Sequence, residues 1–360
     1  MTRSPKTSHR SNLSKDICSM TTLLAQECQL SMTELNSVLE KYAALVNQQI
    51  EEYIPRTGQP VTLHQPMWEL LDRGGKRFRP ALTLLFCKAA GGQERRVLPA
   101  AGAVEILHNM TLIHDDIEDQ SELRRGKPCI HIMFGESAAI NSGDAMLIKV
   151  FEAVADGSLD ATTKNKLIQR FAERAFQITR GQALEFELNN RQSFTDEDVI
   201  EVLRNKTSAL IALACEAGVI AAGGKKNQLS AATKFGEATG VGFQIVDDLL
   251  NVTGDVRKYG KEIGGDIREG KRTIMAAHLI KSAPTEDRER FMKMLGKSTI
   301  SQEEIGEAID LYKKYGSLDH AKGLADKFIE DGVSALKKLP KSSARETIEE
   351  LARFMVRRET

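Results

Sequence analysis

Apolar residues recur at spacings of three and four along most of the chain from about Thr33 onward, whereas alternating apolar and polar positions are scarce. This periodicity predicts long helices over residues 33–54, 95–119, 138–156, 164–190, 208–223, 229–252 and 302–337. Pairs of glycines fall between such segments, at positions 74–75, 91–92, 223–224 and 264–265. The pattern therefore predicts an all-α fold.

Two segments are apolar around most of their circumference, as expected of helices inside a large bundle. They cover residues 209–222 and 231–250 and are rich in Ala, Gly, Val and Ile. No internal repeat or linker interrupts the pattern, so we expect residues 21–360 to form one domain. Residues 1–20 are expected to be a disordered tail, with an organelle transit peptide as the alternative.

Composition and charge narrow the class of partner. The 50 basic residues balance the 50 acidic residues, which gives no reason to expect nucleic acid as a partner. No apolar run approaches a membrane span, so we expect no transmembrane segment. The five cysteines are far apart and include no CxxC pair, which favours reduced thiols and a cytoplasmic location.

An acidic cluster ends one otherwise apolar helical segment. Asp115, Asp116 and Asp119 follow residues 104–114, and the first and last of them are four residues apart and share a helix face. Like charges at that spacing destabilise a bare helix, so the arrangement calls for a cation. Carboxylates without cysteine or clustered histidine favour Mg²⁺ or Mn²⁺ over zinc. Alone, this pattern is equally compatible with a solvated helix end.

A second polar cluster ends another apolar segment. Asp247, Asn251 and Asp255 are each four residues apart, and Asp248 follows the first of them. Clusters at the ends of two helices can face each other across a bundle. Because Mg²⁺ keeps coordination positions for water and phosphate, the two clusters together predict a diphosphate ligand rather than a caged structural ion.

Basic residues accompany the acidic clusters. Residues 74–80 read GGKRFRP, and Arg124, Arg125 and Lys127 follow the first acidic cluster closely. Arginine grips phosphate through a forked pair of donors, and lysine supplies a compact charge. Each run alone is more simply a solvated charge run. Their pairing with the acidic clusters favours an anion site.

Together these motifs resemble those of the trans-type isoprenyl diphosphate synthases, the family of farnesyl and geranylgeranyl diphosphate synthases. They occur in the family's order and cover most of the chain after the tail: residues 74–80, His108, 115–119, 124–126, Gly181-Gln182, Lys206-Thr207, 242–251, Lys261 and 266–271. The resemblance implies an isoprenoid-synthase-type helical bundle around a deep central cavity. It also implies a Mg²⁺-dependent trans-prenyltransferase that joins isopentenyl diphosphate to dimethylallyl, geranyl or farnesyl diphosphate and releases pyrophosphate.

The resemblance assigns roles to single residues and implies a homodimer. The implied metal ligands, for Mg²⁺ expected as three ions with Mn²⁺ as a substitute, are Asp115, Asp119 and Asp247, with Asp116 in support. The implied catalytic group adds Lys206, Thr207 and Gln244. Residues matched to the allylic-diphosphate site are Arg124, Lys206, Gln244 and Lys261, with Thr207 as a hydrogen-bonding neighbour. Residues matched to the isopentenyl-diphosphate site are Lys76, Arg79, His108 and Arg125.

One position departs from the family pattern. The second acidic motif usually ends in Asp, whereas this chain has Asn251. Because an amide still offers an oxygen, we expect a modest effect on metal affinity and no loss of activity.

Product length in this family often depends on the residues four and five positions before the first Asp of the acidic motif. Here these are Thr111 and Met110, and neither carries an aromatic ring, which argues against a product that stops at farnesyl diphosphate. We expect geranylgeranyl diphosphate (C20), with a longer chain if Met110 swings aside and Leu107 becomes the floor. The alternative is that Met110 is ordinary core.

Two other functions remain open from sequence. A class I terpene cyclase or another diphosphate-ionising enzyme also uses acidic helix ends, and the spacing of the second cluster is similar to a cyclase metal motif. The residues Lys76, Arg79, His108 and Arg125 argue against it, because a cyclase binds one diphosphate rather than two. The second alternative is a non-catalytic subunit of a prenyl synthase. The two acidic motifs argue against it, because both are nearly complete.

Overall fold

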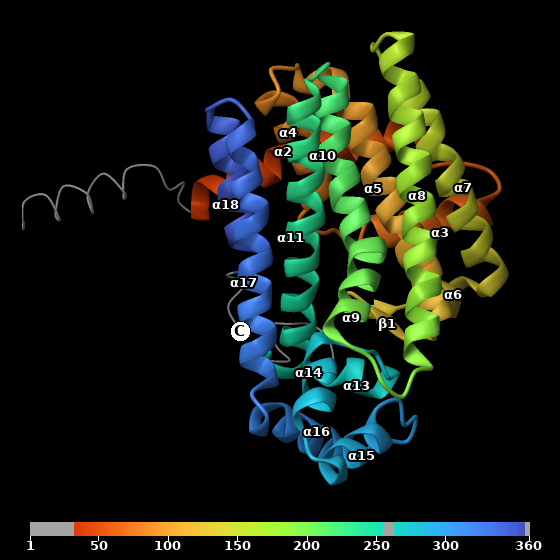
Figure 1. Ribbon diagram of the computed structural model, residues 1–360. Coiled ribbons are helices and arrows are strands. Elements are labelled where there is room, and N and C mark those ends of the chain that lie inside the picture. Colours follow the sequence, from red (N-terminus) through yellow and green to blue (C-terminus); the bar gives the residue numbers. More distant parts are fainter. Residues whose placement is uncertain (1–31, 255–262, 357–360) are drawn as a thin grey trace, which may run out of the picture.

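The computed structural model describes residues 32–254 and 263–356, and over these ranges the fold is all-α (Figure 1). The longer helices are α2 (Met32–Tyr53), α5 (Glu94–Glu118), α7 (Glu136–Ala155), α8 (Ala161–Asn189), α10 (Ala209–Ala221), α11 (Lys226–Thr253) and α17 (Ser317–Ala335). Shorter helices are α3 (Val61–Leu71), α4 (Phe78–Ala89), α6 (Ile130–Phe134), α9 (Asp196–Leu203), α13 (Gly265–Glu269), α14 (Ile274–Ser282), α15 (Thr285–Met294), α16 (Gln302–Lys314) and α18 (Ser343–Val356). Smaller elements are a π-helical turn η1 (Arg204–Ser208), a 3₁₀ turn η2 (Leu336–Lys338) and the paired strands β1 (Leu123–Arg124) and β2 (Lys127–Pro128).

Helix α10 lies at the centre of the bundle because its sequence has almost no polar face. Residues 209–219 are all buried, and the helix packs against α4, α5, α8 and α11. Glycines of α11 allow the close approach. A Cβ at Gly236 would lie 2.4 Å from the Cα of Ala212, and one at Gly240 would lie 2.5 Å from the Cα of Ser208. Close helix packing without these two glycines is therefore sterically blocked.

A smaller apolar core lies at one end of the molecule. It joins the C-terminal half of α11 to α9 and to α14, α15 and α16, which form the lower part of Figure 1. Phe291 of α15 and Tyr312 of α16 pack there with their ring centroids 5.3 Å apart. Helix α17 runs beside α11 and contributes apolar residues to both cores. The two cores are thus joined by continuous helices.

The predicted helices agree with α2, α5, α7, α8, α10 and α11 to within a few residues at each end. The prediction of one helix over residues 302–337 is wrong, because α16 ends at Lys314 and Gly316 adopts a left-handed φ of +69° before α17. The tail predicted for residues 1–20 lies outside the described residues, and the deep cavity stays a prediction. In the part of the chain that the structure describes, no helix has the length and apolarity to span a bilayer.

Candidate active site

Helix α5 ends in the first acidic cluster, and the β1–β2 hairpin engages one of its carboxylates. Asp116 is fully buried, and its Oδ1 accepts a hydrogen bond from Nε of Arg124 at 2.7 Å and lies 2.5 Å from Nη2 of the same residue. Arg73 supports the hairpin by donating to the carbonyls of Arg124 at 3.0 Å and Pro128 at 2.8 Å. Half-buried Asp115 and more exposed Asp119 remain on the open side of the helix end.

The ammonium group of Lys206 lies between carboxylates of two helices. Its Nζ is 2.5 Å from Oε2 of Glu185 on α8 and 3.6 Å from Oδ1 of Asp115 on α5. Burial raises the pKa of Asp119 to about 7, and the nearby carboxylates of Asp115 and Glu185 raise it further. The positive charge of Lys206 acts in the opposite direction but does not cancel this rise. Burial also raises the pKa of Asp115. The acidic group has more negative charge than one lysine balances.

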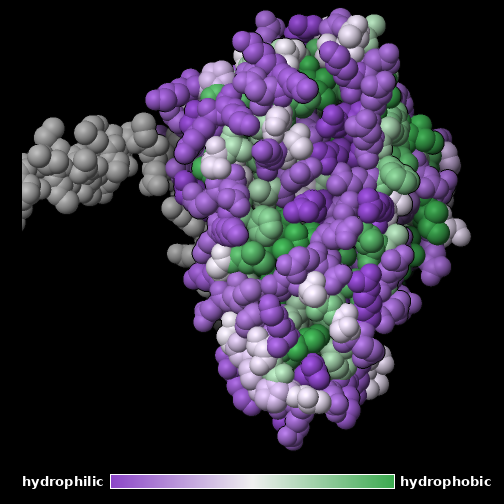
Figure 2. Space-filling view, in the orientation of Figure 1, coloured by the Kyte–Doolittle hydropathy of each residue, from purple (hydrophilic) through white to green (hydrophobic). Residues whose placement is uncertain are grey.

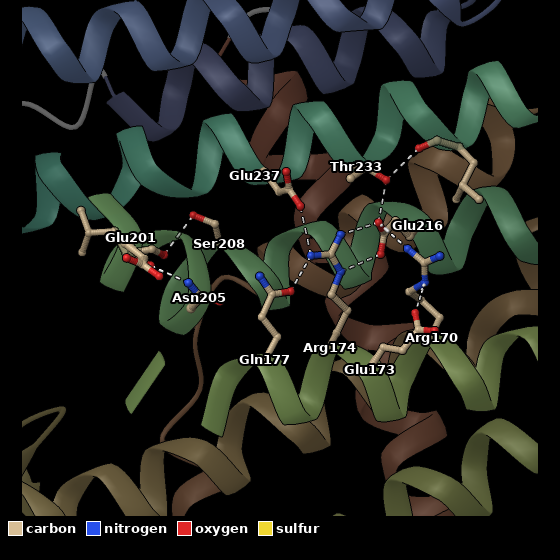
Figure 3. Close-up of polar contacts among 12 residues, drawn as sticks. Arg170, Glu173, Arg174, Gln177, Glu201, Asn205, Ser208, Glu216, Thr233 and Glu237 are labelled. Carbon is tan, nitrogen blue, oxygen red and sulfur yellow. Dashed lines mark hydrogen bonds and ion pairs between the residues drawn. The ribbon is translucent and has the colours of Figure 1, made fainter. Parts of the chain in front are cut away.

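The π-helical turn η1 presents Lys206 and Thr207 to this acidic group. The side chains of Asn205 and Ser208 donate to carbonyls of the preceding turn at 2.8 and 3.1 Å (Figure 3). Such turns are frequent at functional sites. Gly181 of α8 makes room for this one, because a Cβ there would lie 2.2 Å from the backbone N of Lys206. The need for space beside the π-helical turn therefore explains why this motif has a glycine at position 181.

Helix α11 links the second acidic cluster to the same turn. The hydroxyl of Thr207 donates to Oε1 of Gln244 at 3.2 Å, and Nε2 of Gln244 donates to Oδ1 of Asp248 at 3.0 Å. Lys271 Nζ donates to the same Asp248 oxygen at 2.6 Å. Burial alone would lower the pKa of the Lys271 ammonium, but the carboxylates of Asp248 and Asp266 raise it, so the group stays charged.

The remaining members of the second cluster differ in their surroundings. Asp247 is half-buried near the end of α11. Asn251 is 4 % exposed, and its Oδ1 accepts the backbone N–H of Asp266 at 3.1 Å. The oxygen that we expected Asn251 to offer a metal therefore already has a backbone partner. Asp255 and Lys261 lie outside the described residues.

A basic group surrounds His108, two turns before the acidic end of α5. Nη1 of Arg79 lies 3.3 Å from Nε2 of His108. Burial lowers the pKa of His108 well below its usual value, and nearby guanidinium groups lower it further; these belong to Arg79, Arg125, Arg124 and Arg77. A neutral ring among several fixed cations is the arrangement expected of a site for an anion.

The loop at residues 74–77 is shaped for this basic group. Arg125, with a left-handed φ of +52°, donates to the carbonyl of Gly74. A Cβ at Gly75 would lie 3.3 Å from Nη2 of Arg125, so the missing side chain leaves space beside the guanidinium. Arg77 is buried and pairs with Glu105 of α5 at 2.8 Å, which holds the loop against the helix. Its charge is therefore paired with a carboxylate, whereas Arg79 lies directly against the ring of His108.

Lys76 lies at the edge of this loop, beside the C-terminal helix. Its Nζ is 4.7 Å from the ring centroid of Phe354 on α18 and 5.8 Å from that of Phe78. The two rings are themselves packed, with centroids 5.9 Å apart. The ammonium group of Lys76 is therefore held near this aromatic pair.

The residues expected to set product length lie on α5: Met110 and Thr111 between His108 and the acidic group, and Leu107 just before His108. Met110 is partly buried against the main core, and Leu107 is fully buried within it. Thr111 donates its hydroxyl to the carbonyl of His108 at 2.8 Å. Whether these side chains line a product cavity stays a prediction.

The geometry brings together most of the predicted site residues and adds two others. Asp115 and Lys206 meet, Thr207 and Gln244 meet, and Arg79, His108 and Arg125 form a separate group. Sequence reasoning missed Glu185 and gave Lys271 no role of its own. Glu185 follows Gly181 by four residues and shares its face of α8, but its burial, which marks it as a site residue, is visible only in the structure.

The chemistry of the donors fits a hard divalent cation. Among the described residues, no three His, Cys, Asp or Glu side chains are gathered closely enough to hold an ion by themselves. The carboxylates of Asp115 and Asp119 are nevertheless disfavoured in their charged forms, which an added cation would reverse. Oxygen donors that leave coordination positions to water or phosphate are the usual setting for Mg²⁺.

An all-α chain with carboxylates at two helix ends, and a separate arginine group two turns away, has the features of a diphosphate-handling enzyme. Comparison with known proteins identifies the family. The model of the polyprenyl synthetase family matches residues 60–312. The chain belongs to the polyprenyl synthetase family.

Particular relatives cover nearly the whole chain. A short chain isoprenyl diphosphate synthase of Methanothermobacter thermautotrophicus is 36 % identical over 328 residues, which cover 91 % of this chain and 100 % of the relative. The crystal structure of a geranylgeranyl pyrophosphate synthetase from Pyrococcus horikoshii has a TM-score of 0.86 and 37 % identity, covering 91 % of this chain and 99 % of that one. A geranylgeranyl pyrophosphate synthase from Corynebacterium glutamicum, solved with isoprenyl diphosphate and magnesium, has a TM-score of 0.82 and 28 % identity, covering 90 % and 99 %.

Proposed function

We propose that the protein is a trans-prenyltransferase that condenses isopentenyl diphosphate with an allylic diphosphate and releases pyrophosphate. The observation that carries this proposal is that two separate polar groups with cationic side chains gather at two levels of helix α5. Lys206 and the acidic end of α5 form one, and the arginines around His108 form the other. His108 and Asp115 are seven residues apart, close to two helical turns, so both groups lie on the same face of α5. Two diphosphates of unlike environment match two substrates.

The allylic diphosphate is assigned to the acidic side. Lys206 and Lys271 supply fixed positive charge there, and Thr207 and Gln244 supply hydrogen bonds. Charge develops on the diphosphate as the allylic C–O bond breaks, so these groups stabilise the leaving group. Arg124 contributes to this side chiefly through Asp116, which holds its guanidinium.

Isopentenyl diphosphate is assigned to the arginine group. Arg79 and Arg125 face His108, and Lys76 lies beside the loop that carries them. A neutral His108 can donate one ring N–H to a phosphate oxygen without adding charge. The double bond of isopentenyl diphosphate attacks the allylic cation, and the released pyrophosphate is positioned to take the departing proton.

Mg²⁺ is the proposed cofactor, with three ions expected and Mn²⁺ as a substitute. Asp115, Asp119 and Asp247 would hold it together with the substrate, and it would neutralise charge on the leaving diphosphate. The raised pKa of Asp119 and the hard oxygen donors support this assignment. A related structure was solved with magnesium and isoprenyl diphosphate.

Geranylgeranyl diphosphate is the proposed product. Related proteins that match over nearly the full chain are named geranylgeranyl diphosphate synthases, which supports a C20 product. Met110 is the proposed floor residue, with Thr111 beside it and Leu107 one turn deeper. Flexible Met110 in place of an aromatic ring leaves room for a tail longer than farnesyl.

A homodimer is proposed from the exposed apolar residues of α7 and α8. Phe176 is 74 % exposed, Ile148 is 68 % exposed and Ile140 is 46 % exposed. Figure 2 shows apolar groups along the edge of the molecule where these helices lie. We propose that a second copy of the chain buries this exposed apolar surface. Sedimentation of Phe176→Asp would test it: we expect a monomer, and an unchanged mass would refute this surface.

The direct test of the proposed function is product analysis. The purified protein is incubated with labelled isopentenyl diphosphate, Mg²⁺ and, separately, dimethylallyl, geranyl and farnesyl diphosphates. We expect elongation to C20, abolished by EDTA and by Asp115→Ala. Consumption of an allylic diphosphate alone, without isopentenyl diphosphate, would instead indicate a cyclase, and no consumption of either would indicate a non-catalytic subunit.

A further inference from the structure

A second polar group lies between α8, α10 and α11, away from the acidic helix ends (Figure 3). Its centre is the pair of Arg174 and Glu216, in which Nε donates to Oε2 at 3.0 Å and Nη2 to Oε1 at 2.6 Å. Arg170 lies 2.8 Å from Oε1 of Glu216, Thr233 donates to that oxygen at 2.6 Å, and Arg174 Nη1 lies 3.1 Å from Glu237. We call these five residues the ion cluster.

The ion cluster is costly to bury. Glu216 has no exposed surface and Arg174 is 7 % exposed, while the rest of α10 is apolar. The loss of water around two such charges often cancels their attraction, and apolar replacement of a buried pair is frequently neutral or stabilising. The pair instead contributes geometric specificity, because the two parallel guanidinium–carboxylate contacts fix two helices in one relative position.

The ion cluster shares helix faces with the candidate site. On α8, Arg174 precedes Glu185 by eleven residues, close to three turns, and both are on the buried face. On α11, Glu237 precedes Gln244 by seven residues, close to two turns. Glu216 follows the π-helical turn on the same continuous helix. Each helix that the cluster joins thus carries a site residue two or three turns away, or continues directly from the turn that does.

The site depends on how these helices are aligned. Lys206 reaches Glu185, and Thr207 reaches Gln244, only at one axial and rotational position of α8 and α11 against α10. Between the cluster and the site, the closest approaches of the helices are at glycines, among them Gly181, Gly236 and Gly240. These glycines allow close approach but offer no side chain that prevents sliding. The π-helical turn adds a residue to the helix and so changes its register.

We infer that Arg174 and Glu216 are positioning residues that align α8 and α11 on α10, so that the π-helical turn presents Lys206 and Thr207 to the allylic diphosphate. This inference rests on the proposed function for its kinetic readout. The arginine group for isopentenyl diphosphate lies on α4, α5 and the hairpin. Although α4 and α5 also pack against α10, none of the ion-cluster contacts reaches this arginine group, so we expect it to be little affected.

The test is the apolar double variant Arg174→Met/Glu216→Leu. Arg170 and Glu237 keep contact with solvent, with 27 % and 32 % of their side chains exposed, and Thr233 keeps its bond to the carbonyl of Leu229. We expect an unchanged or higher Tm. We also expect kcat and the affinity for inorganic pyrophosphate with Mg²⁺, measured by calorimetry, each to fall about tenfold. The KM for isopentenyl diphosphate should not change.

The controls separate positioning from stability and from the proposed function. Arg345→Met/Glu349→Leu makes the same two side-chain changes at a more exposed pair within α18 alone, and should leave kcat, the pyrophosphate affinity and the KM values unchanged. Arg174→Lys keeps the positive charge but loses the two-pronged guanidinium contact, and should give an intermediate kcat at near-normal Tm. If the double variant does not fold, this single variant provides the test. Wild-type kcat and pyrophosphate affinity in a folded variant, or equal losses in Tm and in both KM values, would overturn the inference. A wild-type protein that elongates no primer would overturn the proposed function as well.

Discussion

The guanidinium of Arg124 and the buried carboxylate of Asp116 form a close pair, with Nη2 2.5 Å from Oδ1. Asp116 is thereby committed to the hairpin, although it stands in the middle of the acidic cluster. Among the residues that the structure describes, the neighbouring Asp115 and Asp119 form no such pair with an arginine. The three aspartates therefore divide into one that is committed to the hairpin and two that we propose as metal ligands.

Substitution should separate these two kinds of aspartate. Asp119→Asn relieves repulsion between carboxylates, so we expect an unchanged or higher Tm and a rise of at least about tenfold in the Mg²⁺ concentration for half-maximal activity. Asp116→Asn leaves Arg124 without its counter-charge, so it should lower Tm while changing the Mg²⁺ requirement several-fold less. Thermal melts and Mg²⁺ titrations measure both quantities. The opposite order of Mg²⁺ effects would contradict the division.

Gly181→Ala should disrupt the π-helical turn. Its Cβ would meet the backbone N of Lys206 at 2.2 Å, and backbone cannot move aside as a flexible side chain can. We expect a loss of about a hundredfold in kcat, because a small displacement of the positioned groups is enough. Gly323→Ala on α17 is the matched control, since a Cβ there has no atom within 4 Å. The control should stabilise the protein by about 0.5–1 kcal/mol in thermal melts.

The ring of His108 should stay neutral in the free protein at pH values well below 6.5. Burial and the arginines lower its folded-state pKa, while the unfolded chain takes up a proton near the usual value. The unfolded state then binds more protons, so this group's contribution to stability falls by about 1.4 kcal/mol per pH unit as pH drops below 6.5. Denaturant titrations of wild type and His108→Gln measure this slope.

NMR of the imidazole nitrogens checks the same point directly. Arg79→Met removes the nearest guanidinium and should raise the pKa of His108, whereas Arg290→Met on α15 should not. A His108 ring that titrates near its usual value in the wild type would argue against a cationic group packed around it.

Substitution of Met110 should change product length in both directions. Met110→Phe places a ring across the proposed floor and should shorten the product to C15, while Met110→Ala should give products longer than C20. Met292→Ala on α15 is the control, because that residue packs in the other core. Chromatography of the dephosphorylated products measures length. Identical products from both Met110 variants would mean that this side chain is ordinary core.

The sequence allowed the long helices to be predicted because they bury one continuous face. Helix α4 was missed because nearly all its residues are buried, which removes the contrast on which periodicity depends, and because its first residues belong to the basic run at positions 74–80, whereas α10, equally buried, has a longer uninterrupted apolar run. The break before α17 depends on a single left-handed glycine. Local sequence alone does not distinguish such a glycine from one inside a helix.

The site was predicted in its residue types but not in its geometry. Lys206 and Thr207 follow from the motif, but the π-helical turn that presents them depends on contacts with Gly181 and Gly240 from distant segments. Likewise, the pairing of Asp116 with Arg124 is a tertiary contact, and the sequence does not show which of the three aspartates pairs with the arginine. Glu185 was missed because one buried acid on a helix has no pattern of its own.

Helix α5 also acts as a ruler. Seven residues separate His108 from Asp115, and at 1.5 Å per residue the helix sets about 10 Å between their levels. A flexible loop between the two groups would let their separation vary, whereas the hydrogen-bonded helix keeps it fixed. One residue inserted between them would turn Asp115 by about 100° away from Lys206. The chain between these two positions can therefore change in identity but not in length.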